Sequence, residues 1–232
     1  MIDATLFAQL KNYDTPTICN ALEIVDPGRR LTGFTVRPLL CPFPHLAPIV
    51  GYAKTATIRA THAHQLDPKA QREQRIAYYE YVAGLPAPGV MVIQDLDGPH
   101  AGFGAFWGEV MSAVHKGLGL AGVVTDGAIR DIDQWAPGFQ VLAGSIAPSH
   151  THVHLHDFGT EVRVAGMLAR SGDLVHADRH GAVTIPAAVA RQIPAACDLL
   201  ARREAVILDL ARAPGFTVAK LREALARQDE IH

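Results

Sequence analysis

The 232-residue sequence has only three cysteines, and none of them forms the CxxC spacing of a zinc or redox motif. An odd number of scattered thiols, at Cys19, Cys41 and Cys197, argues against a disulfide framework and is typical of a cytoplasmic protein. The sequence also lacks a basic excess, because 21 Lys and Arg stand against 23 Asp and Glu, a net charge of −2. Nucleic-acid binding requires positive charge that neutralises phosphates, so we expect no nucleic-acid partner.

Long apolar runs are also absent, and none approaches the roughly 20 residues that a membrane-spanning helix requires. The opening MIDATLFAQL has neither the basic segment nor the long apolar stretch of a secretory signal. We therefore expect a cytoplasmic protein without a membrane partner. What the sequence does have is 49% hydrophobic and 19% charged residues, a composition typical of a folded chain with a sizeable core.

The organisation of the chain predicts a single domain over residues 1–232, with helices at both ends and no internal repeat. The N-terminal helical segment, residues 1–37, contains a helix in which Thr15 is expected to cap and Pro16 to occupy the first helical position. The apolar, proline-rich run 38–48 is predicted to be a packed connection. Helices are predicted again within residues 187–228.

Strands and helices alternate in the middle of the chain, which predicts an α/β core. Residues 49–60 are rich in β-branched side chains, and 89–94 and 121–125 are apolar runs typical of strands buried on both faces. After Trp135 the pattern changes to short strands between Gly and Asp residues, and these are expected to pair as antiparallel hairpins. The intervening helices are predicted at 68–82 and 104–116, and the later strands at 140–143, 161–165, 174–177 and 181–185.

Arg130 and Asp131 are the first candidate site residues. They follow a predicted buried strand that ends at Thr125, and ligands bind at the carboxyl edge of α/β sheets. A guanidinium can hold a carboxylate through two hydrogen bonds, and a carboxylate can hold a hard cation through oxygen. The alternative is that the two residues form a solvated helix start without a ligand.

A second candidate segment, Gly108, Glu109, Val110 and Met111, lies at the turn into the preceding helix. Twenty residues separate Glu109 from Arg130, enough for one helix and one strand that return both to the same sheet edge. Glu109 is therefore expected to face Asp131 across a pocket. Backbone N–H groups at the start of a helix would add donors for an anionic ligand.

These segments, together with GDLVHADRHGAVTIP at 172–186, resemble the RraA-like family. The family includes class II 4-hydroxy-4-methyl-2-oxoglutarate/4-carboxy-4-hydroxy-2-oxoadipate aldolases and regulators of ribonuclease E activity. The resemblance extends over about residues 15–190 and is most specific at 104–131 and 172–186. It implies a swivelling β/α/β sandwich with mixed sheets and flanking helices, assembled as a homotrimer or hexamer with sites between subunits.

The resemblance also implies roles for individual residues. Asp131 matches the family's metal-ligating aspartate, for Mg²⁺ or Mn²⁺, and Arg130 its substrate-binding arginine. Residues 108–111 match the loop whose backbone holds the substrate, and Glu109 replaces an aspartate that holds a water at the metal. The implied activity is cleavage of a 2-keto acid to pyruvate, with oxaloacetate decarboxylation at the same site. Because the regulators retain the Arg-Asp pair, a non-catalytic ribonuclease-binding protein is the alternative.

One further feature lies outside these motifs: His150, His152, His154 and His156 alternate along the chain. In a strand all four would point to one face, most simply at a subunit contact or a solvent edge. A transition-metal site and a part in substrate selection are the alternatives. His176, between apolar neighbours, is expected to be a packed histidine, and Asp178 to form a turn.

Overall fold

The computed structural model describes residues 2–84 and 86–231, and its centre is a curled, mixed sheet of seven strands. These are β1 (Ile49–Arg59), β2 (Gly89–Asp95), β4 (Leu120–Thr125), β6 (Gln140–Leu142), β8 (His154–Phe158), β11 (Leu174–Asp178) and β12 (Gly181–Ile185). The order is β12-β11-β1-β2-β4-β6, and β8 pairs with the second half of β1. β1, β2, β4 and β6 are parallel, whereas β8 and β11 run antiparallel to β1.

The parallel pairing of β6 with β4 corrects the expectation that all strands after Trp135 form antiparallel hairpins. Parallel neighbours require a crossover connection. Here the chain between β4 and β6 makes that crossover through a two-residue strand, Ala128–Ile129, and a short helix, Ile132–Gln134. The later pairs β9/β10 and β11/β12 are antiparallel, as predicted. β9 comprises Val162–Val164 and β10 Met167–Ala169.

A second, three-stranded sheet consists of β3 (Ala105–Trp107), β5 (Ala128–Ile129) and β7 (Ser145–Ile146), all parallel. Its first strand corrects the helix predicted over 104–116. The helix begins only at Glu109, because residues 105–107 pair with β5 and Gly108 adopts an extended conformation. The small sheet therefore carries the two sequence segments in which site residues were predicted.

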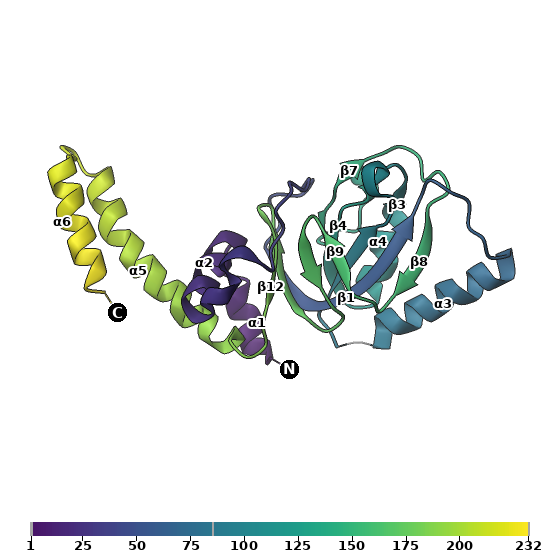
Figure 1. The fold of residues 1–232 in the computed structure, drawn as a ribbon, viewed down its shortest axis with the longest axis horizontal. Coiled ribbons are helices and arrows are strands. Elements are labelled where there is room, and N and C mark those ends of the chain that lie inside the picture. Colours follow the sequence, from purple (N-terminus) through teal and green to yellow (C-terminus); the bar gives the residue numbers. More distant parts are fainter. Residues whose placement is uncertain (1, 85, 232) are drawn as a thin grey trace.

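Six α-helices flank the sheets in the part of the chain that the structure describes. They are α1 (Ala4–Leu10), α2 (Thr15–Val25), α3 (Pro68–Gly84), α4 (Glu109–Gly117), α5 (Ile193–Arg212) and α6 (Val218–Asp229). Short 3₁₀ helices span Pro27–Leu31, Gly98–His100, Ile132–Gln134 and Ala190–Gln192. In Figure 1, α1, α2 and the start of α5 lie beside β12, whereas α3 lies at the opposite end of the molecule, near β8. The rest of α5 extends away from the sheets, with α6 folded back along it.

Helix α2 starts where predicted, but its cap is different. Asp14 is the N-cap, and its Oδ1 accepts a hydrogen bond of 2.9 Å from the Thr17 N–H. Thr15 is the first helical residue, because its N–H and hydroxyl are engaged by residues of β11 instead. The described helices include none that is long and apolar enough to cross a membrane. A single domain over residues 1–232 stays a prediction.

An aromatic cluster fills the core between the sheets and helices α3 and α4. Trp107 and Phe139 stack with ring centroids 6.0 Å apart, and Trp135 packs against both rings. Tyr78 of α3 is also fully buried in this cluster. Large aromatic side chains of this kind bury much apolar surface, and Tyr78 links the cluster to a pocket that it also lines.

Candidate functional site

Arg130 and Asp131 lie at the carboxyl end of β5 in the small sheet. The sequence predicted them just past β4, and the structure inserts β5 between, so that the pair belongs to the second sheet. The Arg130 N–H donates to the Trp107 carbonyl at 2.9 Å, which joins the pair to the end of β3. Asp131 adopts a left-handed conformation, with φ 55° and ψ 41°. Such a conformation is uncommon for a residue other than glycine, and strained residues of this kind cluster at functional sites.

The carboxylate of Asp131 lies against the start of helix α4. Its Oδ2 accepts from the Glu109 N–H at 3.4 Å and is 3.4 Å from Arg130 Nε. A Cβ on Gly108 would overlap this same oxygen, so the approach requires glycine at that position. The unpaired N–H groups at a helix start favour a negative charge there. The two predicted segments therefore meet as expected, within hydrogen-bond distance.

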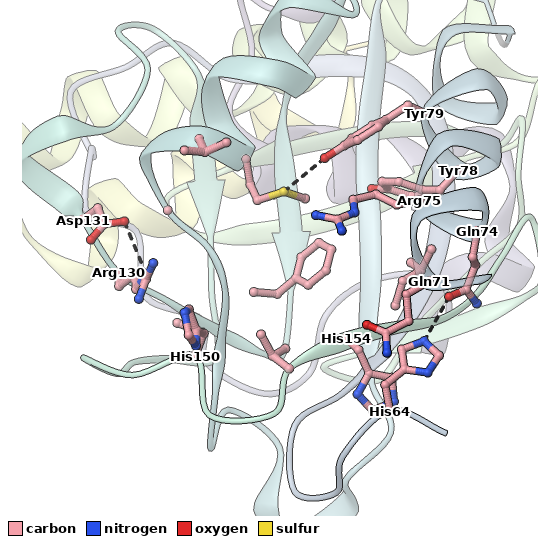
Figure 2. Close-up of a pocket in the computed structure, with 17 residues that line it drawn as sticks. His64, Gln71, Gln74, Arg75, Tyr78, Tyr79, Arg130, Asp131, His150 and His154 are labelled. Carbon is pink, nitrogen blue, oxygen red and sulfur yellow. Dashed lines mark hydrogen bonds and ion pairs between the residues drawn. The ribbon is translucent and has the colours of Figure 1, made fainter. Parts of the chain in front are cut away.

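A pocket of about 370 Å³ opens beside this contact (Figure 2). Five of the six residues predicted to form the site line it together: Gly108, Val110, Met111, Arg130 and Asp131. The side chains of Arg130 and Asp131 are 35% and 37% exposed, so both are accessible to a ligand.

Glu109 is the exception among the predicted residues. Its backbone N–H contacts Asp131, but Glu109 is exposed and is not among the residues that line the pocket. The role that the resemblance implies for its carboxylate therefore stays a prediction.

The opposite wall of the pocket is helix α3, which the sequence analysis did not connect with function. Gln71, Gln74, Arg75, Tyr78 and Tyr79 line the pocket from this helix. Their spacing of three and four residues marks one helical face. This spacing was the available signal, but the many charged residues of the segment are equally typical of a solvated helix. Only the tertiary structure shows which face of α3 lines the pocket.

The four alternating histidines do not share one strand face, which corrects that expectation. Strand β8 begins only at His154, because the preceding residues turn: Thr151 has φ 46°, and its hydroxyl donates to the Ala60 carbonyl at 3.0 Å. His150 and His154 line the pocket, near Arg130 and α3 respectively, and His152 and His156 are exposed outside it.

The ring of His154 stacks on His64, with centroids 4.4 Å apart. Burial, and after it the neighbouring His64 and His156, lower the pKa of His154. Its Nδ1 donates to the His152 carbonyl at 2.8 Å. His154 is therefore neutral near pH 7 and adds no fixed positive charge to the pocket.

A buried histidine supports the floor of the pocket from below. His115 of α4 lies between Tyr78 and Trp107, and burial lowers its pKa to about 4. In the neutral ring Nδ1 donates to the Met111 carbonyl at 2.7 Å, and Nε2 accepts from the Tyr78 hydroxyl at 2.6 Å. The bond to Tyr78 connects α4 to α3, whereas the bond to Met111 lies within α4 and fixes the orientation of the ring.

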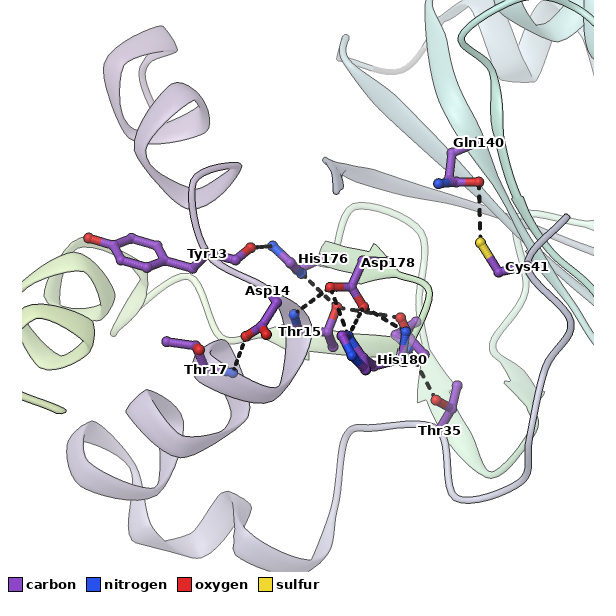
Figure 3. A network of polar contacts seen from close by, with 12 residues as sticks. Tyr13, Asp14, Thr15, Thr17, Thr35, Cys41, Gln140, His176, Asp178 and His180 are labelled. Carbon is purple, nitrogen blue, oxygen red and sulfur yellow. Dashed lines mark hydrogen bonds and ion pairs between the residues drawn. The ribbon is translucent and has the colours of Figure 1, made fainter. Parts of the chain in front are cut away.

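A second polar cluster joins α2 to the main sheet and contributes no residue to the pocket (Figure 3). His176 of β11 is fully buried, as predicted for a packed histidine, and its Nδ1 accepts from the Thr15 hydroxyl at 3.0 Å. Asp178 accepts from the N–H groups of Thr15 and His180, the latter in the predicted turn. Burial opposes ionisation of Asp178, but these N–H bonds outweigh it and lower its pKa. The cluster is a structural link.

Comparison with known proteins identifies the family. Residues 15–184 match the RraA-like family, described as Aldolase/RraA. The chain belongs to this family. The match confirms the resemblance inferred from the sequence, and it includes both segments that meet at Asp131.

Individual relatives of this RraA-like protein are distant. It is 28% identical over 139 residues to a Halalkalibacterium halodurans protein named "Putative 4-hydroxy-4-methyl-2-oxoglutarate aldolase", covering 57% of this chain and 65% of that protein. It is 34% identical over 83 residues to an uncharacterized protein of Methanocaldococcus jannaschii, covering 35% of this chain and 40% of that one. The chain thus spans less than two thirds of the length of both curated relatives.

Solved structures support the fold. The crystal structure of Streptomyces coelicolor RraAS2, described as an unusual member of the RNase ES inhibitor RraA protein family, has a TM-score of 0.68 and 22% identity. The superposed region covers 88% of this chain and 95% of RraAS2. The predicted fold class, mixed sheets with flanking helices, is therefore confirmed.

Proposed function

We propose that this RraA-like protein is a divalent-metal-dependent lyase that cleaves a 2-keto acid to pyruvate. The observation that carries the proposal is the contact between Asp131 and the start of α4, with Arg130 beside it, at the rim of one pocket. A metal ligand, a carboxylate receptor and free backbone donors are the parts that this chemistry needs. The name of the Halalkalibacterium halodurans relative supports the same class of reaction.

The donor set fits Mg²⁺ or Mn²⁺ with Asp131 as the protein ligand. Asp131 Oδ2 is engaged by Arg130 and Glu109, whereas Oδ1 has no partner among the described residues. The described residues contain no group of three His, Cys, Asp or Glu that could hold a metal. Magnesium accepts such a site because it keeps several waters and binds through one or two carboxylates together with substrate oxygens. When bound, the cation supplies Lewis-acid stabilisation of the charge that develops on the keto oxygen.

Arg130 and the start of α4 would bind and orient the substrate. Arg130 uses only Nε for Asp131, so its terminal nitrogens can hold the carboxylate next to the keto group through two hydrogen bonds. The N–H groups of Val110 and Met111, in the first turn of α4, have no intrahelical acceptor and face the same anion. Orientation of this kind lowers the entropic part of the barrier.

The proposed reaction is a retro-aldol cleavage. The substrate's 4-hydroxyl loses its proton, C4 becomes a carbonyl, and the C3–C4 bond breaks with its electron pair on the C3 side. The resulting enolate takes up a proton at C3 and leaves as pyruvate. Loss of CO₂ from oxaloacetate produces the same enolate, so one site serves both reactions. Glu109, through a water, is our candidate for carrying these protons.

The experiment is a coupled assay of pyruvate release from 4-hydroxy-4-methyl-2-oxoglutarate and from oxaloacetate, with Mg²⁺ or Mn²⁺. We expect activity that a chelator abolishes and added metal restores. Arg130→Ala should lower kcat/KM by about 100-fold or more, because a charged, bidentate contact to the reacting group is lost. Activity that survives both the chelator and Asp131→Ala would contradict the metal assignment.

The rival function is that of a non-catalytic regulator that binds a ribonuclease. The described fold of RraAS2 is compatible with it, since a shared fold does not imply a shared function. Absence of pyruvate from every 2-keto acid tested, together with saturable binding to a purified ribonuclease E domain, would favour the regulator. The homotrimer or hexamer that the resemblance implies and the cytoplasmic location expected from the sequence stay proposals. Sedimentation of the purified protein tests the oligomeric state.

A further inference from the structure

The half of the pocket farthest from Asp131 contains a cation that the proposed reaction does not use. Arg75 of α3 lines the pocket, and Figure 2 shows its guanidinium directed from the helix toward the interior. Among the described residues it has no hydrogen bond or ion pair, and its positive charge acts on the nearby Tyr79 hydroxyl. Arg75 is exposed, so its guanidinium is accessible, and an arginine without a partner that lines a pocket is available to an anionic ligand.

The other polar groups around Arg75 are already paired with one another. His64 Nε2 donates to Gln74 Oε1 at 3.1 Å, and its Nδ1 accepts from the Leu66 N–H at 3.0 Å. Gln74 also donates to the His156 carbonyl at 3.3 Å, and Gln71 to the Leu66 carbonyl at 2.7 Å. These bonds tie α3 to β8 and to the loop after β1. They hold α3 in place, and they leave the guanidinium of Arg75 available as a hydrogen-bond donor to a ligand.

The charge of this region indicates what it would bind. His64 uses both ring nitrogens in the hydrogen bonds to Gln74 and Leu66, and burial lowers the pKa of His154, so that His154 adds no fixed positive charge. The fixed positive charge of this region is the planar guanidinium of Arg75, which matches one carboxylate. A phosphate dianion would call for further cations or a helix start, and the described wall has neither.

We infer that Arg75 is a specificity-determining residue that binds a second carboxylate at the far end of the substrate. This inference rests on the proposed function, in which Arg130 holds the first carboxylate at the other end of the same pocket. The preferred substrates are then 2-keto acids with carboxylates at both ends, and Tyr79 and Phe106 contact the chain between them. Arg75 would act in binding and leave the bond-breaking step unchanged.

The test compares two substrates that differ only at the far end. 4-Hydroxy-4-methyl-2-oxoglutarate has a carboxylate there, and 4-hydroxy-4-methyl-2-oxopentanoate has a methyl group instead. For Arg75→Gln we expect KM for the first substrate to rise about 10-fold or more, with kcat nearly unchanged. For the second substrate kcat/KM should stay within about twofold, because there is no charge to lose.

Arg72→Gln is the matched control, since Arg72 lies one turn earlier on the same helix, is exposed and does not line the pocket. It should leave both substrates unchanged. An equal loss on both substrates in Arg75→Gln, or the same selective loss in Arg72→Gln, would overturn the assignment.

A binding experiment separates this inference from the proposed function. Calorimetry in Mg²⁺ compares 2-oxoglutarate with 2-oxopentanoate, which differ by the same carboxylate and contain no bond for a retro-aldol step. We expect the first to bind at least 10-fold more tightly, and Arg75→Gln to remove the difference. That result supports the second carboxylate site even if no pyruvate is released in any assay. Equal affinities, or no binding of either acid, would overturn it.

Discussion

Asp131 Oδ2 lies 3.4 Å from the backbone nitrogen of Glu109, and the two residues follow strands β5 and β3 of the same small sheet. The contact places a carboxylate at the start of a helix, where the helix dipole and a free N–H favour its charge. Asp131 adopts a left-handed conformation at this contact, which is uncommon for a residue other than glycine.

Gly108→Ala should disable the site while leaving the fold intact. A Cβ at Gly108 would overlap Asp131 Oδ2 and lie 3.3 Å from Arg130 Cγ, so the carboxylate must move away. We expect kcat/KM for pyruvate release to fall about 10-fold or more, because small displacements of catalytic groups are costly. Gly117→Ala, at the other end of α4, meets no atom within 4 Å and should leave activity unchanged. Similar kinetics for the two variants would contradict the role of the contact.

Asp131→Asn and Asp131→Ala should separate charge from backbone strain. Asparagine tolerates the left-handed conformation and still accepts from the Glu109 N–H, but it is a poor ligand for a hard cation. We expect the free energy of unfolding of Asp131→Asn to stay within about 0.5 kcal/mol of the wild-type value. Its kcat should fall about 100-fold or more. Asp131→Ala should lose activity and also about 1 kcal/mol of stability. Chemical denaturation and the coupled assay measure the two effects.

Acid should destabilise the protein through His115. Burial lowers its folded-state pKa to about 4, against 6.5 for the free side chain. Between these pH values the unfolded chain binds a proton that the folded protein does not, so the free energy of unfolding falls as the pH falls. The slope from this group approaches about 1.4 kcal/mol per pH unit, and above pH 6.5 it vanishes.

Urea denaturation at pH 5 and pH 8 measures this effect, and His115→Gln should reduce the difference between the two values. Burial also lowers the pKa of His176. This residue therefore adds a pH dependence of the same sign, which the variant should keep. A pH dependence in the variant equal to that of the wild type would contradict the assignment to His115.

Thr15→Val should weaken the fold without affecting the pocket. It removes the hydroxyl that bonds to His176 Nδ1 and leaves a buried ring nitrogen unsatisfied. We expect a loss of about 1–2 kcal/mol in the free energy of unfolding, with kcat and KM unchanged. Thr17→Val is the control on the same helix, because Thr17 uses its backbone, and not its hydroxyl, in the Asp14 cap. A large change in kcat for Thr15→Val would show that the cluster in Figure 3 also serves the site.

The parts of the fold that follow from local pattern were predictable. The apolar runs that form β2 and β4, the helix that starts at Pro68 and the capped helix α2 have the expected type and nearly the expected ends. The meeting of segment 108–111 with Asp131 was predictable too, because the spacing allows a helix and a strand that return the chain to the same edge, although the structure adds β5 before Asp131. Both are consequences of spacing along the chain.

Predictions failed where a distant segment decided the conformation. Residues 105–107 form a strand because β5 lies beside them, and β6 is parallel because the chain crosses over through the small sheet. The histidine run splits because Thr151 bonds to the Ala60 carbonyl before β8 begins. Each of these outcomes depends on hydrogen bonds between residues far apart in the sequence, which periodicity does not encode.

The amino-acid order alone determined the family, the α/β alternation and the Arg130–Asp131 doublet with its glycine turn. These features depend on side-chain chemistry and short spacings, which a linear pattern preserves. Only the tertiary structure decided that Arg75 lines the same pocket as Arg130, whereas Glu109 is not among the residues that line it. The direction in which a helix face points is set by packing against distant elements, and for α3 those are β8 and the loop that follows β1.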